Sequence, residues 1–223
     1  MENNMKALLI GASGLTGGHC LQLILKDSFY TQVEIWVRKS TGITHPKLIE
    51  KVIDFNAIET MENIDVQHIF CCLGTTIKKA GSQENFYKAD HDYVIAVAEI
   101  AARSGAEKFL YISSIGANSQ SKNFYLRTKG KVEDDLKKKF KNGLVIFRPS
   151  MLMGKRSEFR FGELVGKGFM KIFGFLFIGK MKKYRGIEAS TVAEAMICCA
   201  KSEAQGQIIY ESDKIAALVV NGH

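Results

Sequence analysis

A tyrosine and a lysine, Tyr125 and Lys129, stand four residues apart in a segment whose pattern predicts a helix over residues 123–140. Residues at this spacing share one face of a helix, so we expect both side chains to project in the same direction. A free phenol titrates at about pH 10, and a neighbouring ammonium lowers that pKa by stabilising the phenolate. The pair is therefore suited to proton transfer near neutral pH, with Tyr125 exchanging the proton.

Two serines, Ser113 and Ser114, come at the end of a predicted strand, Lys108–Ser113, a short distance before Tyr125. A serine hydroxyl in this position can hold the oxygen of a carbonyl group while the tyrosine passes the proton. The spacing alone does not decide which of the two serines has this role. Together these residues indicate acid–base chemistry at a carbonyl group.

A glycine-rich turn lies at the junction between the first predicted strand, Lys6–Ile10, and a helix predicted over about 15–26. Its glycines allow a tight turn and let an anion approach the backbone, while the helix N-terminus offers free amides to a pyrophosphate. Because the turn lies at the first strand-to-helix junction, it predicts dinucleotide binding rather than a structural loop. The residues expected to contact the cofactor there are Gly11, Ser13, Gly14, Leu15, Thr16 and Gly17.

The end of the second predicted strand, Gln32–Val37, indicates which dinucleotide is bound. An acidic residue at this place binds the adenosine ribose and repels a 2′-phosphate. Here the strand is followed by two cations, Arg38 and Lys39, while Glu34 lies too early in the strand to reach the ribose. We therefore expect NADP (NADPH) as the cofactor. The alternative is that both cations are only exposed turn residues.

Two further strand ends are placed for the cofactor, because open α/β sheets bind ligands beyond the carboxyl ends of their strands. Asp54 and Phe55 follow the third strand and are expected to meet the adenine ring. Leu73, Gly74 and Thr75 follow the fourth strand, where a glycine lets the backbone approach a ribose.

The chain up to residue 150 alternates short β-branched runs with longer amphipathic segments, which is typical of βαβ units on a parallel sheet. We expect an α/β fold, a doubly wound parallel sheet with a small C-terminal substrate-facing lobe. Residues 1–154 would form the NADP-binding core, and residues 155–223 a substrate-binding region integrated with it as one structural domain. The predicted strands are Lys6–Ile10, Gln32–Val37, Leu48–Asp54, His68–Leu73, Lys108–Ser113, Leu144–Arg148 and, at the sheet edge, Gln207–Tyr210. The predicted helices are 15–26, 82–103, 123–140, one starting near Ser157, and 191–201.

These motifs resemble the short-chain dehydrogenase/reductase superfamily, and within it the atypical branch that contains the Tat-interactive oxidoreductases. The resemblance covers roughly residues 6–154 and fades beyond them. It is carried, in order, by the glycine-rich turn, Phe70–Thr76, Lys79–Gly81, Asp92–Val94, the serine pair, Tyr125-Leu126, Lys129-Gly130, Val132-Glu133 and Phe147–Pro149.

The resemblance implies a Rossmann fold, NADP(H) as the cofactor and a serine–tyrosine–lysine catalytic set. It implies that Ser114, the second serine of the pair, holds the substrate oxygen and that Lys129 also binds the nicotinamide ribose. Pro149, Ser150 and Met151 resemble the segment that packs on the nicotinamide and bonds its carboxamide.

We therefore expect an NADP-dependent oxidoreductase that transfers hydride between the nicotinamide and a carbonyl or alcohol substrate. Two alternatives stay open. One is a redox-sensing regulatory protein that binds NADP(H) with little turnover, because a fold does not fix a function. The other is an enzyme similar to nucleotide-sugar epimerases, for which the short C-terminal region leaves little room.

Composition narrows the class of protein further. The five cysteines, Cys20, Cys71, Cys72, Cys198 and Cys199, suit neither a disulfide framework nor zinc-site spacing, so we expect reduced thiols in a cytoplasmic protein. No export signal and no membrane insertion are expected, because the apolar stretches are too short. The net charge of +8 is spread along the chain, so no nucleic-acid partner is expected. A monomer or a homodimer fits this composition.

Three polar segments are interpreted as ordinary structural features rather than as metal, catalytic or nucleic-acid sites. His91 and Asp92, near Asp90, resemble half of a metal or hydrolase site, but the start of a helix explains them, and no metal is expected. The lysines of 137–141 are interpreted as a solvated helix end. The basic, aromatic segment 161–183 is predicted to be an amphipathic helix or lid over the substrate pocket, with adsorption to a membrane as the alternative.

Overall fold

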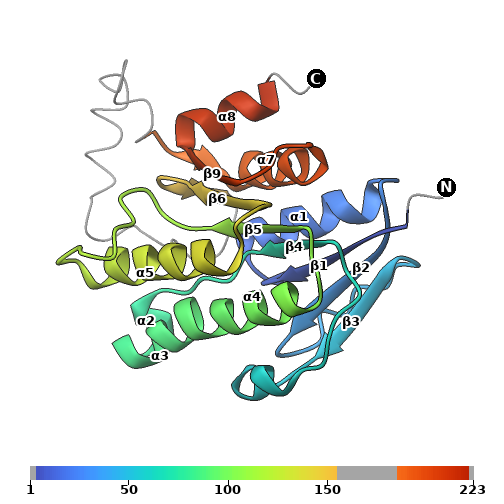
Figure 1. Ribbon diagram of the computed structural model, residues 1–223, viewed down its shortest axis with the longest axis horizontal. Helices are drawn as coiled ribbons and strands as arrows, with labels where there is room; N and C mark the ends of the chain where they lie inside the picture. Colours follow the sequence, from blue (N-terminus) through green and yellow to red (C-terminus); the bar gives the residue numbers. More distant parts are fainter. Residues whose placement is uncertain (1–3, 155–184, 221–223) are drawn as a thin grey trace.

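The computed structural model describes residues 4–154 and 185–220, which are built around a sheet of seven parallel strands (Figure 1). The strand order is β3–β2–β1–β4–β5–β6–β9, so the chain starts in the middle of the sheet and winds outward in both directions. This arrangement confirms the predicted doubly wound α/β fold. The strands are β1 Met5–Ile10, β2 Tyr30–Val37, β3 Leu48–Val52, β4 His68–Cys71, β5 Lys108–Ile112, β6 Leu144–Arg148 and β9 Gln207–Glu211.

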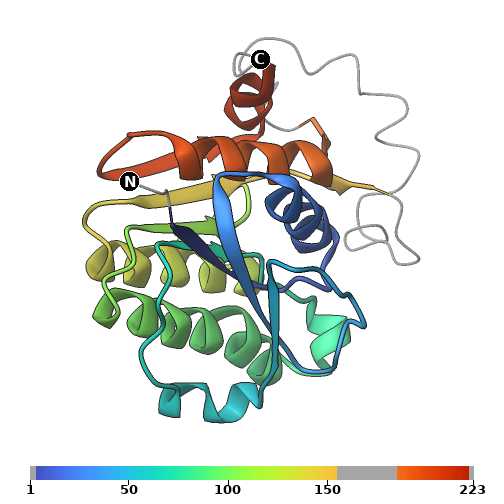
Figure 2. The same cartoon turned by 90° about the vertical axis from the view of Figure 1, so that its right-hand side faces the viewer.

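Helices cover both faces of the sheet (Figure 2). Helices α1 and α7 pack against each other on one face, and α4 and α5 cover the other face. A separate two-stranded pairing joins β7, Leu152–Met153, to β8, Ile187–Glu188. The helices are α1 Leu15–Lys26, η1 Phe55–Thr60, α2 Ile77–Ala80, α3 Gln83–Tyr87, η2 Lys88–Asp92, α4 Tyr93–Arg103, α5 Phe124–Lys139, α7 Ala189–Lys201 and α8 Ser212–Val220.

The sheet separates two hydrophobic layers, because successive side chains of a strand point to opposite faces. In β1, Leu9 joins the layer beneath α1 and α7, whereas Leu8 and Ile10 join the layer beneath α4 and α5. All three side chains are fully buried. Strands that are covered on both faces consist of nearly continuous apolar residues, which is why the sequence pattern identified them.

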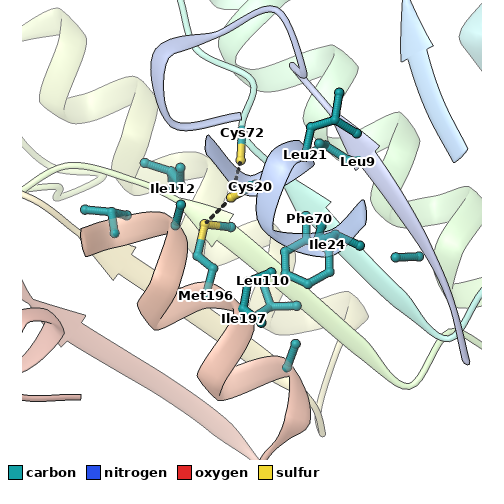
Figure 3. Packing of buried hydrophobic residues seen from close by; sticks show 14 of the residues in the cluster. Leu9, Cys20, Leu21, Ile24, Phe70, Cys72, Leu110, Ile112, Met196 and Ile197 are labelled. Atoms are coloured by element: carbon teal, nitrogen blue, oxygen red, sulfur yellow. Dashed lines mark hydrogen bonds between the residues drawn. The ribbon is translucent and has the colours of Figure 1, made fainter. Parts of the chain in front are cut away.

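Three sulfur atoms lie close together in the layer beneath α1 and α7 (Figure 3). The Sγ atom of Cys20 on α1 is 3.9 Å from Cys72 Sγ, just after β4, and 3.9 Å from Met196 Sδ on α7. The hydrogen bond with Cys20 and burial raise the pKa of the Cys72 thiol well above its usual value. All five cysteines are free, and only Cys198 is exposed.

The predicted strands and helices within the described residues are present, with ends that differ by one to a few residues. The predicted helix 82–103 is divided into α3, a π-helical turn (η2) and α4. Helix α8 and the short helices η1 and α2 were not predicted. The helix expected near Ser157 and the segment 161–183 lie outside the described residues. Across residues 4–154 and 185–220, no helix is both long and apolar enough to cross a membrane.

A buried histidine makes the stability of this fold depend on pH. His68 at the start of β4 is 2% exposed, and its Nδ1 atom is 2.8 Å from the hydroxyl of Tyr30. Burial and the charge of Lys108 lower the pKa of His68 from 6.5 to about 4. In the unfolded chain His68 is therefore protonated below pH 6.5, whereas in the folded chain it stays neutral until about pH 4.

We expect the free energy of unfolding to fall by up to about 3 kcal/mol between pH 6.5 and pH 4 because of this one group. Urea unfolding at several pH values, with wild type and His68→Gln, measures the effect. The variant should lose most of this dependence, whereas His45→Gln, in the loop after β2, should keep it. Equal slopes in wild type and His68→Gln would contradict the assignment.

Candidate cofactor and catalytic site

The glycine-rich turn connects β1 to α1 and leaves no space for side chains at two positions. Gly11 has a φ of +84°, which favours glycine, and a Cβ atom there would lie 2.6 Å from the carbonyl oxygen of Cys72. A Cβ atom at Gly17 would lie 2.1 Å from the carbonyl oxygen of Gly11. Gly14 caps α1 without a side-chain hydrogen bond, so the first amides of this helix stay available to an anion.

A pocket lies at the carboxyl ends of the central strands, next to this turn. It brings together Ser114, Tyr125 and Lys129, the three residues predicted to be catalytic. Its walls come from the glycine-rich turn, from the segments after β4, β5 and β6, from η2 and from α5. We call it the catalytic pocket, and it is lined by Leu15, Thr16, Cys72, Leu73, Gly74, Thr75, Asp90, Ile112, Ser113, Ser114, Tyr125, Lys129, Pro149, Ser150, Met151 and Leu152.

The two serines of the pair have different surroundings. The buried hydroxyl of Ser113 donates a hydrogen bond to the carboxylate of Glu133, and Arg148 forms a bidentate ion pair with the same carboxylate. Ser113 therefore belongs to a structural network between β5, α5 and β6. Ser114 is half-buried, and within the described residues its hydroxyl makes a single long hydrogen bond, of 3.3 Å, to the carbonyl oxygen of Ile115. This leaves Ser114 better able to bond a substrate oxygen.

Lys129 is held in the pocket wall by one ion pair and one hydrogen bond. Its ammonium is 2.9 Å from the carboxylate of Asp90 and donates to the hydroxyl of Tyr111 at 3.1 Å. Burial alone would lower the pKa of Lys129, but the charge of Asp90 holds it well above its usual value. An ammonium carries three N–H donors, which suits a group that must bind more than one oxygen.

Asp90 was not predicted as part of the site. It lies in the π-helical turn Lys88–Asp92 and is fully buried. The neighbouring His91 contacts Asp92 through Nδ1 at 2.8 Å and Asp135 of α5 through Nε2 at 3.1 Å, and both residues lie in the π-turn rather than at the start of a helix. No group of three or more metal-binding side chains occurs in the described parts of the chain. π-turns are frequent at functional sites, but this one was not recognisable in the sequence, which predicted one continuous helix over 82–103.

A second pocket continues from the first, because Leu73, Gly74 and Thr75 line both of them. We call it the basic pocket, since three of the side chains in its wall are cations and, among the described residues, none is acidic. It also contains two aromatic rings that suit a nucleobase. Its lining is Arg38, Phe55, Asn56, Leu73, Gly74, Thr75, Lys79, Ala80, Asn85, Lys88, Ala89 and Tyr93.

Six of the residues expected to bind the cofactor do not line either pocket: Gly11, Ser13, Gly14 and Gly17 of the glycine-rich turn, and Lys39 and Asp54. Lys39 is exposed in the turn after Arg38. The carboxylate of Asp54 accepts hydrogen bonds from the amide and the side chain of Asn56, both at 2.9 Å, and so caps η1. Lys79 and Lys88, in contrast, were not predicted for this role. Lys79 lies in α2, which was not predicted, and Lys88 lies in η2, within the predicted helix 82–103, whose orientation toward the cofactor site the sequence pattern did not reveal.

The two pockets fit a dinucleotide. The hydroxyl of Thr16 is buried in the wall of the catalytic pocket and, within the described part of the chain, has no hydrogen-bond partner, as expected for a group that meets a ligand. The uncapped N-terminus of α1 suits the pyrophosphate. The three cations of the basic pocket suit a further phosphate.

Comparisons with known proteins agree with this geometry. The sequence profile of a family described as NAD(P)H-binding matches residues 11–167. Protein HTATIP2 of Rattus norvegicus is 33% identical over 212 residues, which cover 92% of this chain and 85% of the relative. The mitochondrial protein FMP52 of Eremothecium gossypii is 31% identical over 227 residues, covering 96% and 97% of the two chains.

The predicted cytoplasmic location is wrong in the light of these relatives. FMP52 and several other curated fungal relatives are named as mitochondrial proteins. The prediction rested on reduced cysteines, and free thiols argue only against an oxidising compartment. They do not distinguish the cytoplasm from the interior of an organelle.

A solved structure supports the fold at low sequence identity. The UDP-N-acetylglucosamine 4-epimerase of Methanobrevibacter ruminantium M1, in complex with UDP-N-acetylmuramic acid, superposes with a TM-score of 0.68 at 16% identity. The match covers 94% of this chain and 77% of the epimerase. The chain therefore belongs to the NAD(P)H-binding family of Rossmann-fold proteins, among the relatives of the Tat-interactive protein, as its motifs implied.

Proposed function

We propose that this protein is an NADP-dependent oxidoreductase of the short-chain dehydrogenase/reductase type, acting on a carbonyl or alcohol substrate. The observation that carries the proposal is the meeting of Ser114, Tyr125 and Lys129 in one pocket that continues into a second pocket rich in cations. The coarser function, an NAD(P)-binding domain similar to oxidoreductases, follows from the family.

The residues have distinct roles in this proposal. The cofactor supplies or accepts the hydride. Ser114 holds the substrate oxygen, and Tyr125 gives that oxygen a proton during reduction or removes it during oxidation. The Lys129 ammonium stabilises the phenolate form of Tyr125 and would also donate a hydrogen bond to the nicotinamide ribose. Pro149–Met151, in the wall of the same pocket, would pack against the nicotinamide.

Substrate recognition is assigned to the C-terminal part of the chain. Residues 1–154 would bind the cofactor, and residues 155–223 would complete the substrate side as part of the same structural domain. Support comes from Ser150, which accepts a hydrogen bond at its hydroxyl from Ser212 of α8, 3.0 Å away, and donates one to the carbonyl oxygen of Arg185. The cofactor-binding wall is thus tied directly to the later segment.

The enzyme proposal is tested by following oxidation of NADPH with a panel of aldehydes and ketones. Steady turnover of any class that exceeds the rate without substrate supports it. Tight binding of NADPH with no turnover of the panel, or of the corresponding alcohols with NADP⁺, would overturn it in favour of a cofactor-binding regulatory protein.

The choice of NADPH over NADH is tested at Arg38. Charge-assisted hydrogen bonds to a phosphate contribute about 1.5–3 kcal/mol each, so Arg38→Gln should weaken NADPH binding about 10–100-fold. Binding of NADH should change little, because NADH has no 2′-phosphate. Fluorescence titration of both cofactors measures this.

Lys39→Gln is the matched control, because Lys39 is the next residue and lies outside both pockets. It should leave the ratio of the two affinities unchanged. If wild type binds NADH more tightly than NADPH, the assignment of the cofactor fails. If Lys39→Gln alone alters the ratio, the 2′-phosphate lies outside the basic pocket.

A further inference from the structure

We propose that Asp90 is a positioning residue that keeps the Lys129 ammonium charged and in place beside Tyr125, and so completes the catalytic group. The inference deepens the proposed oxidoreductase function and rests on it. It comes from the contacts of a carboxylate that no sequence motif had singled out.

The contacts of Asp90 are direct and are shielded from water. One of its carboxylate oxygens is 2.9 Å from Lys129 Nζ, and the other accepts a hydrogen bond from the backbone amide of Thr75 at 2.7 Å. The side chain of Asp90 is fully buried and that of Lys129 is 4% exposed. A buried charge without a partner is strongly unfavourable, so each of these two groups requires the other.

In the parts of the chain that the structure describes, the other titratable groups that act on Lys129 bring no compensating negative charge at neutral pH. Tyr111 on β5 and Cys71 on β4 face the pair, and burial raises the pKa of each of them above its usual value, so both stay protonated. Tyr125, which lies on the same helix as Lys129, α5, interacts with it electrostatically. Of the groups named here, Asp90 alone is a carboxylate. It is therefore the counter-ion of Lys129.

This pairing affects the pH at which the site works. Reduction of a carbonyl group requires Tyr125 as the neutral phenol and Lys129 as the ammonium. Without the carboxylate, burial would lower the pKa of Lys129, and any ammonium that remained would act on Tyr125 without compensation and favour its phenolate. Either change would stop carbonyl reduction at a lower pH than in wild type. The alkaline limit of the reaction therefore moves in the same direction whichever change dominates.

Asp90 also connects the site to the loop after β4. Thr75, whose amide it binds, lies in the wall shared by the catalytic and basic pockets. One carboxylate thus fixes Lys129 on α5 and the loop that both halves of a dinucleotide would touch. A residue with only a packing role would not need both polar contacts.

Asp90→Asn tests the inference, because it keeps the shape and a hydrogen-bond acceptor but removes the charge. We expect the alkaline limb of the pH profile of kcat/KM, measured for carbonyl reduction, to move about 1–3 pH units lower. Asp92→Asn, two residues away and exposed, is the matched control and should leave that limb in place. A purely structural role for Asp90 would reduce activity equally at all pH values, and that result would overturn the proposal.

A second measurement needs no turnover and uses the wild-type Asp90. In wild type labelled with [¹³C]lysine, the Cε signal of Lys129, identified by its loss in Lys129→Arg, should remain that of an ammonium beyond the ordinary pKa of 10.5. Titration of this signal below 10.5 would overturn the proposal. If the signal behaves as expected but no substrate is turned over, Asp90 keeps its role in holding Lys129 and the proposed function fails instead.

Discussion

Tyr125→Phe should lower kcat about 10²–10⁴-fold, which is the range that a positioned general acid contributes. The substitution removes the hydroxyl that exchanges the proton and keeps the aromatic ring, whose centroid lies 5.7 Å from that of Phe86. Folding and cofactor affinity should therefore stay close to those of wild type. Steady-state kinetics with the best substrate of the carbonyl panel, together with NADPH titration, measures both quantities.

Tyr93→Phe is a suitable control for this variant. Tyr93 lines the basic pocket and donates a hydrogen bond to Asn56 at 2.9 Å, so its hydroxyl is near the expected adenine and far from the proton transfer. It should change cofactor affinity at most a few-fold and leave kcat unaltered. Full turnover by Tyr125→Phe would remove the proposed mechanism, whatever the cofactor.

Gly17→Ala should have the largest effect on cofactor binding. A Cβ atom at this position would lie 2.1 Å from the oxygen and 2.8 Å from the carbon of the Gly11 carbonyl, and backbone atoms cannot move aside as a flexible side chain can. The turn must open, at a cost of about 1–3 kcal/mol in the free energy of unfolding. Since the pyrophosphate depends on the same turn, we expect the dissociation constant for NADPH to rise at least about tenfold.

The adjacent glycine gives a close comparison. A Cβ atom at Gly18 would be 3.6 Å from the carbonyl oxygen of Ala12, an ordinary contact distance. Because Gly18 lies inside α1, Gly18→Ala should bind NADPH as wild type does and be more stable by about 0.5–1 kcal/mol. Thermal unfolding and NADPH titration of the two variants distinguish a requirement at residue 17 from a general sensitivity of α1. Equal behaviour of both variants would contradict the prediction.

The features that could be predicted from sequence are those that depend on local pattern. Buried parallel strands produce apolar runs, so β6 was predicted with its observed bounds, Leu144–Arg148. The glycine-rich turn was recognisable because its backbone conformation requires glycine at fixed spacing. Tyr125 and Lys129 were recognisable because helical spacing alone places them on one face.

The features that could not be predicted depend on contacts between distant parts of the chain. Asp90 is 39 positions before Lys129, and nothing in its neighbourhood indicates that its side chain is buried against an ammonium. Which of Ser113 and Ser114 is engaged in a structural network likewise depends on Glu133 of α5 and Arg148 of β6. Each of these required the packed structure, because a carboxylate looks the same in sequence whether it is solvated or buried.

In the basic pocket, too, the grouping of the charged side chains depends on contacts between distant parts of the chain. The sequence associated Arg38 with Lys39, its neighbour in the chain, whereas in the structure Arg38 shares a pocket with Lys79 and Lys88. Lys79 lies in α2, whose four residues are too few for a hydrophobic pattern, and Lys88 lies in a predicted helix whose packing next to the end of β2 the sequence does not show. Adjacency in sequence was therefore a poor guide to which cations act together.

The π-helical turn Lys88–Asp92 limits which changes of length this region tolerates. An α-helix turns about 100° per residue, and a π-turn holds one residue more than the α-helical path. Deletion of a single residue from it would rotate α3 and α4 relative to each other by about that angle and carry the carboxylate at position 90 away from α5. An insertion in a surface loop would leave the contact between Asp90 and Lys129 intact. In the π-turn, by contrast, the number of residues matters as much as their identity.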